Sequence, residues 1–337
     1  MIRFDAIVSV SDPSAVSEVR RAALLRATSV GFDETEAGRI ALVATELATN
    51  LVKHGGPGSI LLGGDDETLQ LHLLAIDKGR GIASLPAAME DGFSTAGSPG
   101  TGLGAIRRST TGLSVFSLPH KGTVISCCIL RNGTPSVPKA GADVPVSIAG
   151  ICLPKPPEEV SGDAWGGVAS PSEVSVMVAD GLGHGFAAAA ASGAAIRSFH
   201  GTARSSVEEI LRATHGALRP TRGAAVAVAR IHGRVGKIEF AGVGNIAASV
   251  VDDDGTRRAV SHNGIVGHEI RKVQMFSYPW SPAAILLMHS DGIGTGWSID
   301  QYPGLRTQSP EVIAAVIYRD HCRGTDDATI VVAKGRG

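Results

Sequence analysis

The chain has 337 residues, of which 43% are hydrophobic and 19% charged, and its formal net charge is −1 at pH 7. This length suits two domains better than one core, and the composition is that of a folded globular protein rather than a disordered one. A charge balance near zero gives no electrostatic case for nucleic acid or an anionic membrane, so we expect neither as a partner. Nothing in the composition indicates the oligomeric state.

The cysteines and the N-terminus indicate where the protein works. None of the four cysteines forms a C-x-x-C pair, and the adjacent Cys127 and Cys128 would point to opposite faces of a strand. Buried, reduced thiols are therefore expected, which suits a reducing compartment. The N-terminus lacks the basic-then-apolar pattern of a signal peptide, and the most apolar stretch, 186–196, is too short to span a bilayer. We expect a cytoplasmic protein.

Residues 1–131 predict an α/β domain. Alternating apolar residues indicate strands, whereas longer periodic stretches with Ser, Asp or Gly at their ends indicate helices. The predicted helices are 15–30, 34–54 and 102–110, and the predicted strands are 2–10, 59–62, 69–76, 112–118 and 122–130. The segment 83–100 is polar and has little period of its own.

Residues 132–145 contain three prolines and two glycines without periodicity, which predicts a linker between two domains. The second domain, 146–337, is rich in predicted strands. These strands are 146–152, 173–178, 224–231, 237–241, 247–251, 257–261 and 283–289, with helices at 185–200, 206–217 and 310–321.

Polar side chains recur on one face of the second predicted helix: Glu46, Asn50, Lys53 and His54. An amide oxygen such as that of Asn50 is a hard ligand for Mg²⁺, and a carboxylate one turn away can orient or deprotonate an attacking hydroxyl. Taken alone, such a stripe is more often a solvated polar face. Its interpretation as a site therefore depends on the motifs that follow it.

Two glycine-containing motifs follow this helix. Asp77 ends an apolar strand, where its carboxylate can accept a hydrogen bond from the exocyclic amine of adenine, although a simple Asp-x-Gly turn is the common alternative. The glycines of 100–104 open a predicted helix, whose N–H groups and dipole can meet phosphates; a flexible loop is the alternative. The order and spacing of all three motifs together favour an ATP site.

In this order the three motifs resemble the GHKL (Bergerat) ATP-binding family, and within it the RsbT-like anti-sigma-factor serine kinases. The resemblance covers roughly residues 1–131. It implies an α/β sandwich that uses ATP and Mg²⁺, with Glu46 as the general base and Asn50 as the Mg²⁺ ligand. The remaining ATP-binding residues that it implies are Asp77, Gly79, Gly81, Gly102 and Gly104, beneath a lid formed by residues 83–100.

The second half carries isolated aspartates at strand ends and turns: Asp163, Asp180, Asp291 and Asp326. Converging carboxylates can hold octahedral Mg²⁺ or Mn²⁺, and a pair of such ions can activate water for attack on phosphorus. A β-turn explains any single Asp-Gly equally well. That explanation weakens for the glycine-rich stretch 180–185, because a turn rarely needs three glycines and a histidine directly before a helix.

These aspartates and the stretches 155–165 and 242–246 resemble the RsbX and SpoIIE-like branch of the PP2C (PPM) serine/threonine phosphatases. The resemblance implies a PP2C-like α-β-β-α sandwich and two Mn²⁺ or Mg²⁺ ions. The implied metal ligands are Asp163, Asp180, Asp291 and Asp326, with Gly181 contributing its carbonyl. Lys155 stands where eukaryotic-type members have a phosphate-gripping arginine, and participation of Lys155, His184 and Asp327 stays open.

Together the resemblances imply a bifunctional protein serine/threonine kinase and metal-dependent phosphatase. Its expected partners are STAS-domain antagonists or scaffolds of the RsbS/RsbR type, in a stressosome or partner-switching pathway that controls a stress response. The alternative is a phosphatase delivered to its substrate by a GHKL module that binds ATP or a partner without catalysis. The presence of Glu46 disfavours this alternative, since a pure binding module needs no base.

Overall fold

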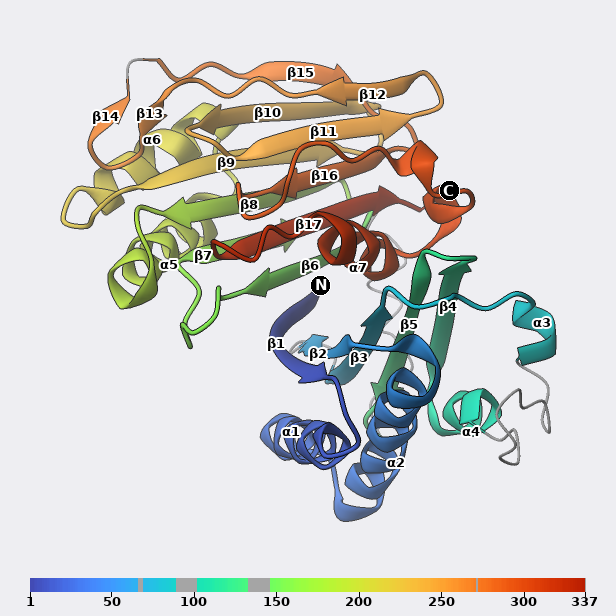
Figure 1. Cartoon of the computed structure of the whole chain (residues 1–337). Helices are drawn as coiled ribbons and strands as arrows, with labels where there is room; N and C mark the ends of the chain where they lie inside the picture. The colour runs from blue at the N-terminus through green and yellow to red at the C-terminus, as the bar shows by residue number, and fades with distance from the viewer. Residues whose placement is uncertain (66–68, 89–101, 133–145, 271, 337) are drawn as a thin grey trace. The chain divides into compact units, whose positions relative to one another are not determined.

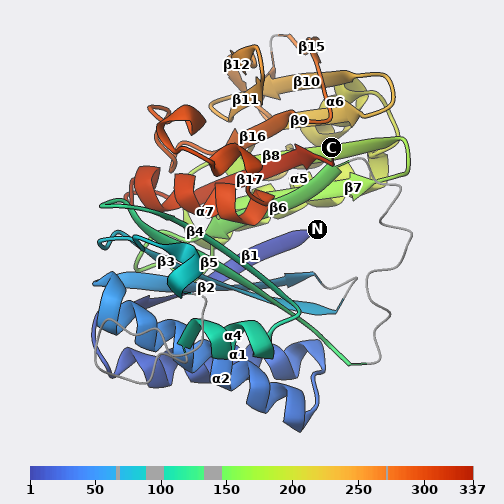
Figure 2. The same cartoon turned by 90° about the vertical axis from the view of Figure 1, so that its right-hand side faces the viewer.

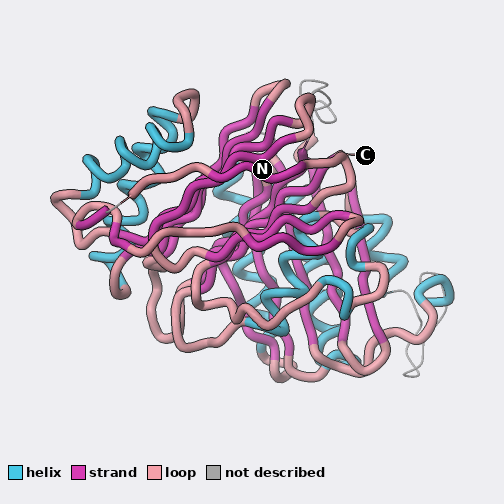
Figure 3. Tube along the Cα trace, turned by 90° about the horizontal axis from the view of Figure 1, so that it is seen from above, coloured by secondary structure: helices cyan, strands magenta, loops and turns pink. Residues whose placement is uncertain are grey.

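The computed structural model describes the chain except for residues 66–68, 89–101, 133–145, 271 and 337. The chain forms two compact units. Figure 3 shows the described helices and strands of the whole chain by colour. The N-terminal unit consists of Ile2–Val137 and Ser298–Arg319, and the C-terminal unit consists of Met1, Pro138–Trp297 and Asp320–Gly337. The linker expected at 132–145 lies almost wholly outside the described residues, and the predicted domain limits remain a prediction.

The N-terminal unit is built on an antiparallel sheet with the strand order β1-β2-β3-β5-β4. Three helices, α1 (Ala15–Val30), α2 (Glu34–Asn50) and α4 (Gly102–Ser109), lie on one face of this sheet (Figure 2). The short helix α3 spans Leu85–Ala88. The strands are β1 (Ile2–Val10), β2 (Gly58–Asp65), β3 (Gln70–Asp77), β4 (Gly112–Leu118) and β5 (Gly122–Leu130).

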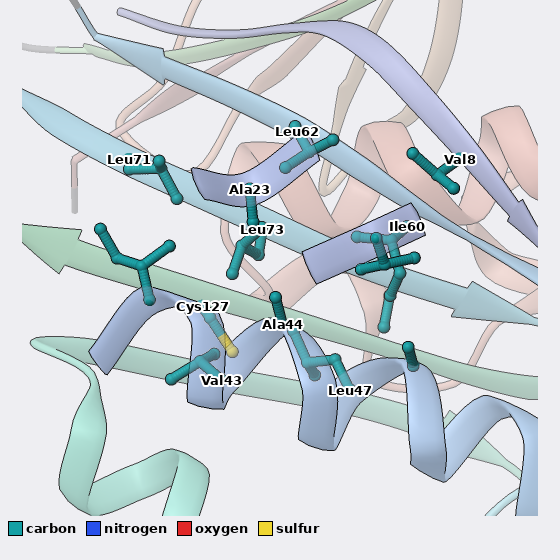
Figure 4. Close-up of a cluster of buried hydrophobic side chains, with 14 of the residues drawn as sticks. Val8, Ala23, Val43, Ala44, Leu47, Ile60, Leu62, Leu71, Leu73 and Cys127 are labelled. Atoms are coloured by element: carbon teal, nitrogen blue, oxygen red, sulfur yellow. The ribbon is translucent and has the colours of Figure 1, made fainter. Parts of the chain in front are cut away.

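Alternation along the strands creates the core of this unit. Side chains such as Ile60, Leu62 and Leu73 pack against Val43 and Leu47 of α2 (Figure 4). Burial of each such side chain contributes about 1.5–3 kcal/mol, which positions α2 on the sheet. The helix also begins at a well-defined residue, because Asp33 and Glu36 form a reciprocal capping box.

The segment Ser298–Arg319 packs with this unit although it is distant in sequence. It contains two 3₁₀ turns, Ile299–Gln301 and Leu305–Thr307, and most of α7 (Pro310–His321). Figure 2 shows α7 on the face of the sheet opposite α1, α2 and α4. The two faces of the N-terminal unit are therefore covered by helices from different parts of the sequence.

The C-terminal unit contains two sheets, with the orders β12-β11-β16-β17-β6 and β15-β10-β9-β8-β7 (Figure 1). Val176, Phe240, Val250 and Leu286 belong to the hydrophobic cluster that these strands share. Helices α5 (Gly185–Thr202) and α6 (Val207–Leu218) cover the second sheet. The strands are β6 (Val146–Leu153), β7 (Asp163–Ala169), β8 (Glu173–Gly181), β9 (Ala224–His232), β10 (Lys237–Val243), β11 (Ala247–Asp252), β12 (Gly255–Arg258), β15 (Phe276–Pro279), β16 (Ile285–His289) and β17 (Ala328–Gly335), with a separate ladder of β13 (Gly264–Ile265) and β14 (Glu269–Ile270).

The predicted class, two domains that each mix helices and strands, is confirmed. Two element predictions are wrong. The helix expected at 34–54 ends as an α-helix at Asn50 and continues as a π-helical turn, Leu51–Gly55. The strand expected at 257–261 is instead β12, which pairs with β11 immediately after the turn at Asp252–Gly255. In the part of the chain that the structure describes, no helix is both long and apolar enough to cross a membrane.

Candidate functional site

Only one of the two carboxylate oxygens of Asp77 accepts hydrogen bonds within the N-terminal unit. Asp77 ends β3 and is 7% exposed, and its Oδ1 accepts hydrogen bonds from the backbone N–H of Gly79 (2.8 Å) and of Thr123 (3.2 Å). No described residue donates to its Oδ2. Burial raises the pKa of this carboxyl. One oxygen is therefore fixed by the backbone, and the other is available to an outside donor.

Backbone segments pack so closely around Asp77 that two neighbouring positions have no room for a side chain. A Cβ on Gly79 would lie 2.5 Å from the carbonyl oxygen of Gly55. Gly81 has a φ of +72°, and its Cβ would lie 2.3 Å from the carbonyl oxygen of Leu118. Both predicted glycines are thus required by this turn, which brings the main chain against the Asp77 carboxylate.

Glu46 and Asn50 lie one turn apart at the end of α2, and both are partly exposed. Lys53 and His54 do not continue this α-helical face, because the π-helical turn changes their angular spacing. The expected four-residue stripe is therefore corrected to a pair. Burial lowers the pKa of His54, and the charges of Arg80 and Lys53 lower it further.

The phosphate end of this candidate site is partly described. Gly102 is the first residue of α4, and Gly104 is buried in the same helix. The loop before it and most of the lid expected at 83–100 lie outside the described residues. The position of Gly102 fits the expected role of a helix N-terminus, and the roles of both glycines stay predictions.

A second candidate site lies in the C-terminal unit, around a cavity of about 560 Å³. Three of the predicted aspartates line it: Asp180 near the end of β8, Asp291 after β16 and Asp326 before β17. These strands are far apart in sequence, and the fold places these three carboxylates on the wall of one cavity.

The cavity is strongly anionic. Burial raises the pKa of Asp180 to about 7, and the negative charges of Asp291 and Asp326 add to the shift. The side-chain amide of Asn245 donates to Asp291 Oδ2 (2.8 Å) and lies 3.5 Å from Asp180 Oδ2. Asn245 stands in the stretch 242–246 on which the resemblance rests, but no role was predicted for it.

The carboxylate oxygens of these three aspartates suit hard divalent cations, which prefer oxygen ligands. A bound cation would also offset the repulsion between the neighbouring negative charges. Among the described residues, no three His, Cys, Asp or Glu side chains form a preformed metal cluster. A bound ion would have to draw Asp180, Asp291 and Asp326 closer together.

Asp163 is not among the described residues that line this cavity. It pairs in register with Asp180 across β7 and β8, and it is 5% exposed. Burial raises its pKa well above the usual range, and the charge of Asp180 acts in the same direction. The hydroxyl of Ser290 donates to Asp163 Oδ2 at 2.6 Å and accepts from the N–H of Thr329 at 3.0 Å. Ser290 thus positions the Asp163 carboxylate, a role that its place in the sequence does not indicate.

Asp327 is committed to the backbone. Its Oδ1 accepts from the N–H of Lys155 and its Oδ2 from the N–H of Gly162, both at 2.8 Å. It is 3% exposed, and the neighbouring Asp326 lines the cavity instead. These two hydrogen bonds hold the 155–162 segment against β17, and we predict a structural role for Asp327.

Replacing Asp327 with asparagine should lower the free energy of unfolding by about 2 kcal/mol, because one buried N–H would face an amide that cannot accept. Urea unfolding of the full chain measures this change, with Asp300→Asn, an exposed aspartate, as the matched control. Unchanged stability combined with lost metal binding would instead make Asp327 a ligand.

The other two residues whose participation is open lie at the cavity itself. Lys155 and His184 line it, and His184 Nδ1 is 2.8 Å from Glu158 Oε1. Gly181 follows Asp180 at the end of β8, where a Cβ would lie 2.1 Å from the carbonyl oxygen of Ala188. Its carbonyl role remains a prediction, as do the roles of the four aspartates.

Two family models match the chain. Residues 10–128 match the histidine kinase-like ATPase domain, and residues 170–336 match stage II sporulation protein E (SpoIIE). The two matches cover the two halves in the order that the motifs predicted.

Individual proteins are similar to the same regions. The serine/threonine-protein kinase RsbT of Bacillus subtilis (strain 168) is 36% identical over 101 residues, which are 29% of this chain and 76% of RsbT. A solved structure described as the bacterial stressosome, a modular system adapted to control secondary messenger signaling, is 27% identical with a TM-score of 0.53, covering 56% of this chain and 99% of that one. The crystal structure of RsbX in complex with magnesium is 22% identical with a TM-score of 0.50, covering 56% and 95%.

Proposed function

We propose that this chain is both a protein serine/threonine kinase and a protein phosphatase. It belongs to the RsbT family through its histidine kinase-like ATPase domain, and it also carries a SpoIIE domain. The kinase site would transfer phosphate from ATP to a hydroxyl of a partner protein. The phosphatase site would hydrolyse the resulting phosphoester. Both reactions would act on one partner, so that a single chain sets its level of phosphorylation.

On the kinase side, Asp77 supplies the recognition of the base. Its free Oδ2 accepts from the adenine amine, while Gly79 and Thr123 hold Oδ1 in place. Glu46 accepts the proton of the attacking hydroxyl, and Asn50, one turn further, would bind Mg²⁺. Mg²⁺, when bound, supplies charge neutralisation for the phosphates. The half-satisfied carboxylate of Asp77 is the observation that supports this assignment most directly.

On the phosphatase side, Asp180, Asp291 and Asp326 would hold two Mn²⁺ or Mg²⁺ ions, with Asp163 and the Gly181 carbonyl behind them. Divalent cations, when bound, supply water activation and neutralise phosphate charge. Asn245 orients two of these carboxylates, and Lys155 places a positive charge in the cavity where the substrate phosphate would enter. The anionic cavity is the observation that supports this half of the proposal.

The partner follows from the similarities rather than from the geometry. RsbT is a serine/threonine-protein kinase, and a stressosome structure is among the similar solved structures. We therefore expect the substrate to be a STAS-domain antagonist or scaffold of the RsbS/RsbR type in a partner-switching pathway. Location in the cytoplasm is part of the same proposal.

The adenine assignment predicts a change of base preference in Asp77→Asn. The asparagine amide would present a donor to the adenine amine, so the affinity for ATP should fall about 10- to 100-fold, the worth of a hydrogen bond to a charged group. GTP carries a carbonyl at the corresponding position, so its affinity should not fall. Titration of the full chain with fluorescent ATP and GTP analogues measures both values.

Glu159→Gln, an exposed carboxylate in the C-terminal unit, is the control and should leave both affinities unchanged. An unchanged preference for ATP in Asp77→Asn would reject Asp77 as the adenine-binding residue.

A further inference from the structure

The backbone carbonyl of Asp77 lies beyond the paired part of β3 and β5, so it receives no regular sheet hydrogen bond from β5. The β3–β5 register ends at Ile76 and Val124, and the N–H of Thr123 bonds to the Asp77 side chain instead. This carbonyl nevertheless faces β5, because a Cβ on Gly122 would lie 2.0 Å from it. A buried carbonyl in this position requires a donor from elsewhere.

Arg319 supplies that donor. Its Nη1 donates to the carbonyl oxygen of Asp77 at 3.2 Å, and the arginine is 7% exposed. It lies on α7, in the segment Ser298–Arg319 that packs with the N-terminal unit. The positive charge also lowers the pKa of the Asp77 carboxyl and so opposes the effect of burial. Arg319 thus favours both the position and the ionised state of Asp77.

The segment 298–319 is anchored at two further points of the same unit. Glu311 Oε1 accepts from the hydroxyl of Ser126 on β5 at 3.4 Å, and Glu311 is 8% exposed. Lys121 donates through Nζ to the carbonyl oxygen of Gln301 at 2.9 Å and lies 4.9 Å from the ring centre of Tyr302. With contacts before and along α7, Arg319 has a defined position rather than that of a mobile surface side chain.

We propose that Arg319 is a positioning residue of the nucleotide site, and that the segment 298–319 completes that site. The proposal rests on the proposed role of Asp77 in binding adenine. Residues 298–319 fall inside the match to SpoIIE. Part of the SpoIIE region therefore serves ATP recognition, and the two activities do not divide at the linker.

The proposal is tested on the full chain with Arg319→Gln, Arg319→Lys and the control Arg20→Gln, an exposed arginine on α1 of the same unit. Affinities for fluorescent ATP and GTP analogues are measured on folded protein. Loss of the charged donor frees the Asp77 carbonyl, so Arg319→Gln should bind the ATP analogue roughly tenfold more weakly, with GTP unaffected. Arg319→Lys should recover part of the preference for ATP, and Arg20→Gln should match the unaltered chain.

Base preference separates positioning from a merely structural role, which would lower stability without changing the ratio of the two affinities. An unchanged ratio in Arg319→Gln, with a reduced ratio in Asp77→Asn, would overturn this proposal and leave the proposed function standing. An unchanged ratio in Asp77→Asn would overturn the adenine assignment itself. If Arg319→Gln does not fold, the folded Arg319→Lys chain decides the question: a reduced ratio of ATP to GTP affinity is expected, and an unreduced ratio would overturn the proposal.

Discussion

A Glu46→Gln chain is expected to bind ATP normally and to transfer its phosphate about 10² to 10⁴ times more slowly. Glutamine keeps the size of the side chain but cannot accept the proton of the attacking hydroxyl. The substitution therefore removes the general base, and the expected loss of rate is that of general-base catalysis. Glu46 is partly exposed at the end of α2, so the substitution should leave the core unchanged. Incorporation of radiolabelled phosphate into a STAS-domain partner measures the transfer rate.

Asn50→Ala serves as the comparison, because its defect should differ in kind. Removing the proposed Mg²⁺ ligand should weaken Mg²⁺-dependent ATP binding, whereas Glu46→Gln should leave binding intact. Undiminished phosphorylation by Glu46→Gln would exclude it as the base. It would leave room for the alternative in which the N-terminal unit binds ATP or a partner without catalysis.

Asp180→Asn should reduce phosphate release from the phosphorylated partner by more than about 100-fold. Loss of residues that only support metal ligands already costs about 10- to 100-fold, so loss of a ligand should cost more. The reason lies in the cavity, where Asp180, Asp291 and Asp326 converge and need a compensating positive charge. Phosphate release is measured with excess Mn²⁺ or Mg²⁺.

The controls for this prediction are a substitution and a chelator. Asp300→Asn, at an exposed position, should release phosphate at the unaltered rate. Chelation should abolish release by the unaltered chain, and Mn²⁺ or Mg²⁺ should restore it better than Ca²⁺, whose coordination is larger and looser. Release that persists in excess chelator would contradict a metal-dependent mechanism.

Local motifs made much of both sites predictable. Asp77 follows an apolar strand and precedes closely spaced glycines, so its place at a strand end could be expected from the residues alone. The same holds for Asp180 and Asp291, because each combines a strand with an adjacent glycine. Convergence of these carboxylates needed only the assumption that strand ends share one edge of a fold.

Features that depend on long-range packing could not be predicted. Arg319 belongs to a helix whose sequence indicates burial but not the unit against which it packs. The hydrogen bonds of Asp327 join segments more than a hundred residues apart, and adjacent aspartates give no indication of which one faces a cavity. Strand β7 is not predicted from the sequence because Gly166 and Gly167 disfavour strands. The structure gives a reason for the first of these glycines: a Cβ on Gly166 would lie only 3.0 Å from Ile196 of α5.

The change from α-helix to π-helix after Asn50 could not be predicted from the sequence either. The stretch after Asn50 has no proline and keeps apolar residues at helical spacing, so a continuous α-helix was the natural expectation. The chain instead forms a π-helical turn that ends at Gly55, which lies against Asp77. The close approach of Gly55 to Asp77 is a tertiary constraint, and helical periodicity carries no information about it.

The most direct test of two opposed activities on one chain follows phosphate on a STAS-domain partner over time, with radiolabelled ATP, Mg²⁺ and Mn²⁺. With the unaltered chain, labelled partner should stay at a low steady level while free phosphate continues to accumulate. With Asp180→Asn, the partner should become labelled to near one phosphate per molecule and remain so. If Asp180→Asn left the partner unlabelled, the chain would not be a kinase of that partner, and the central claim would be contradicted.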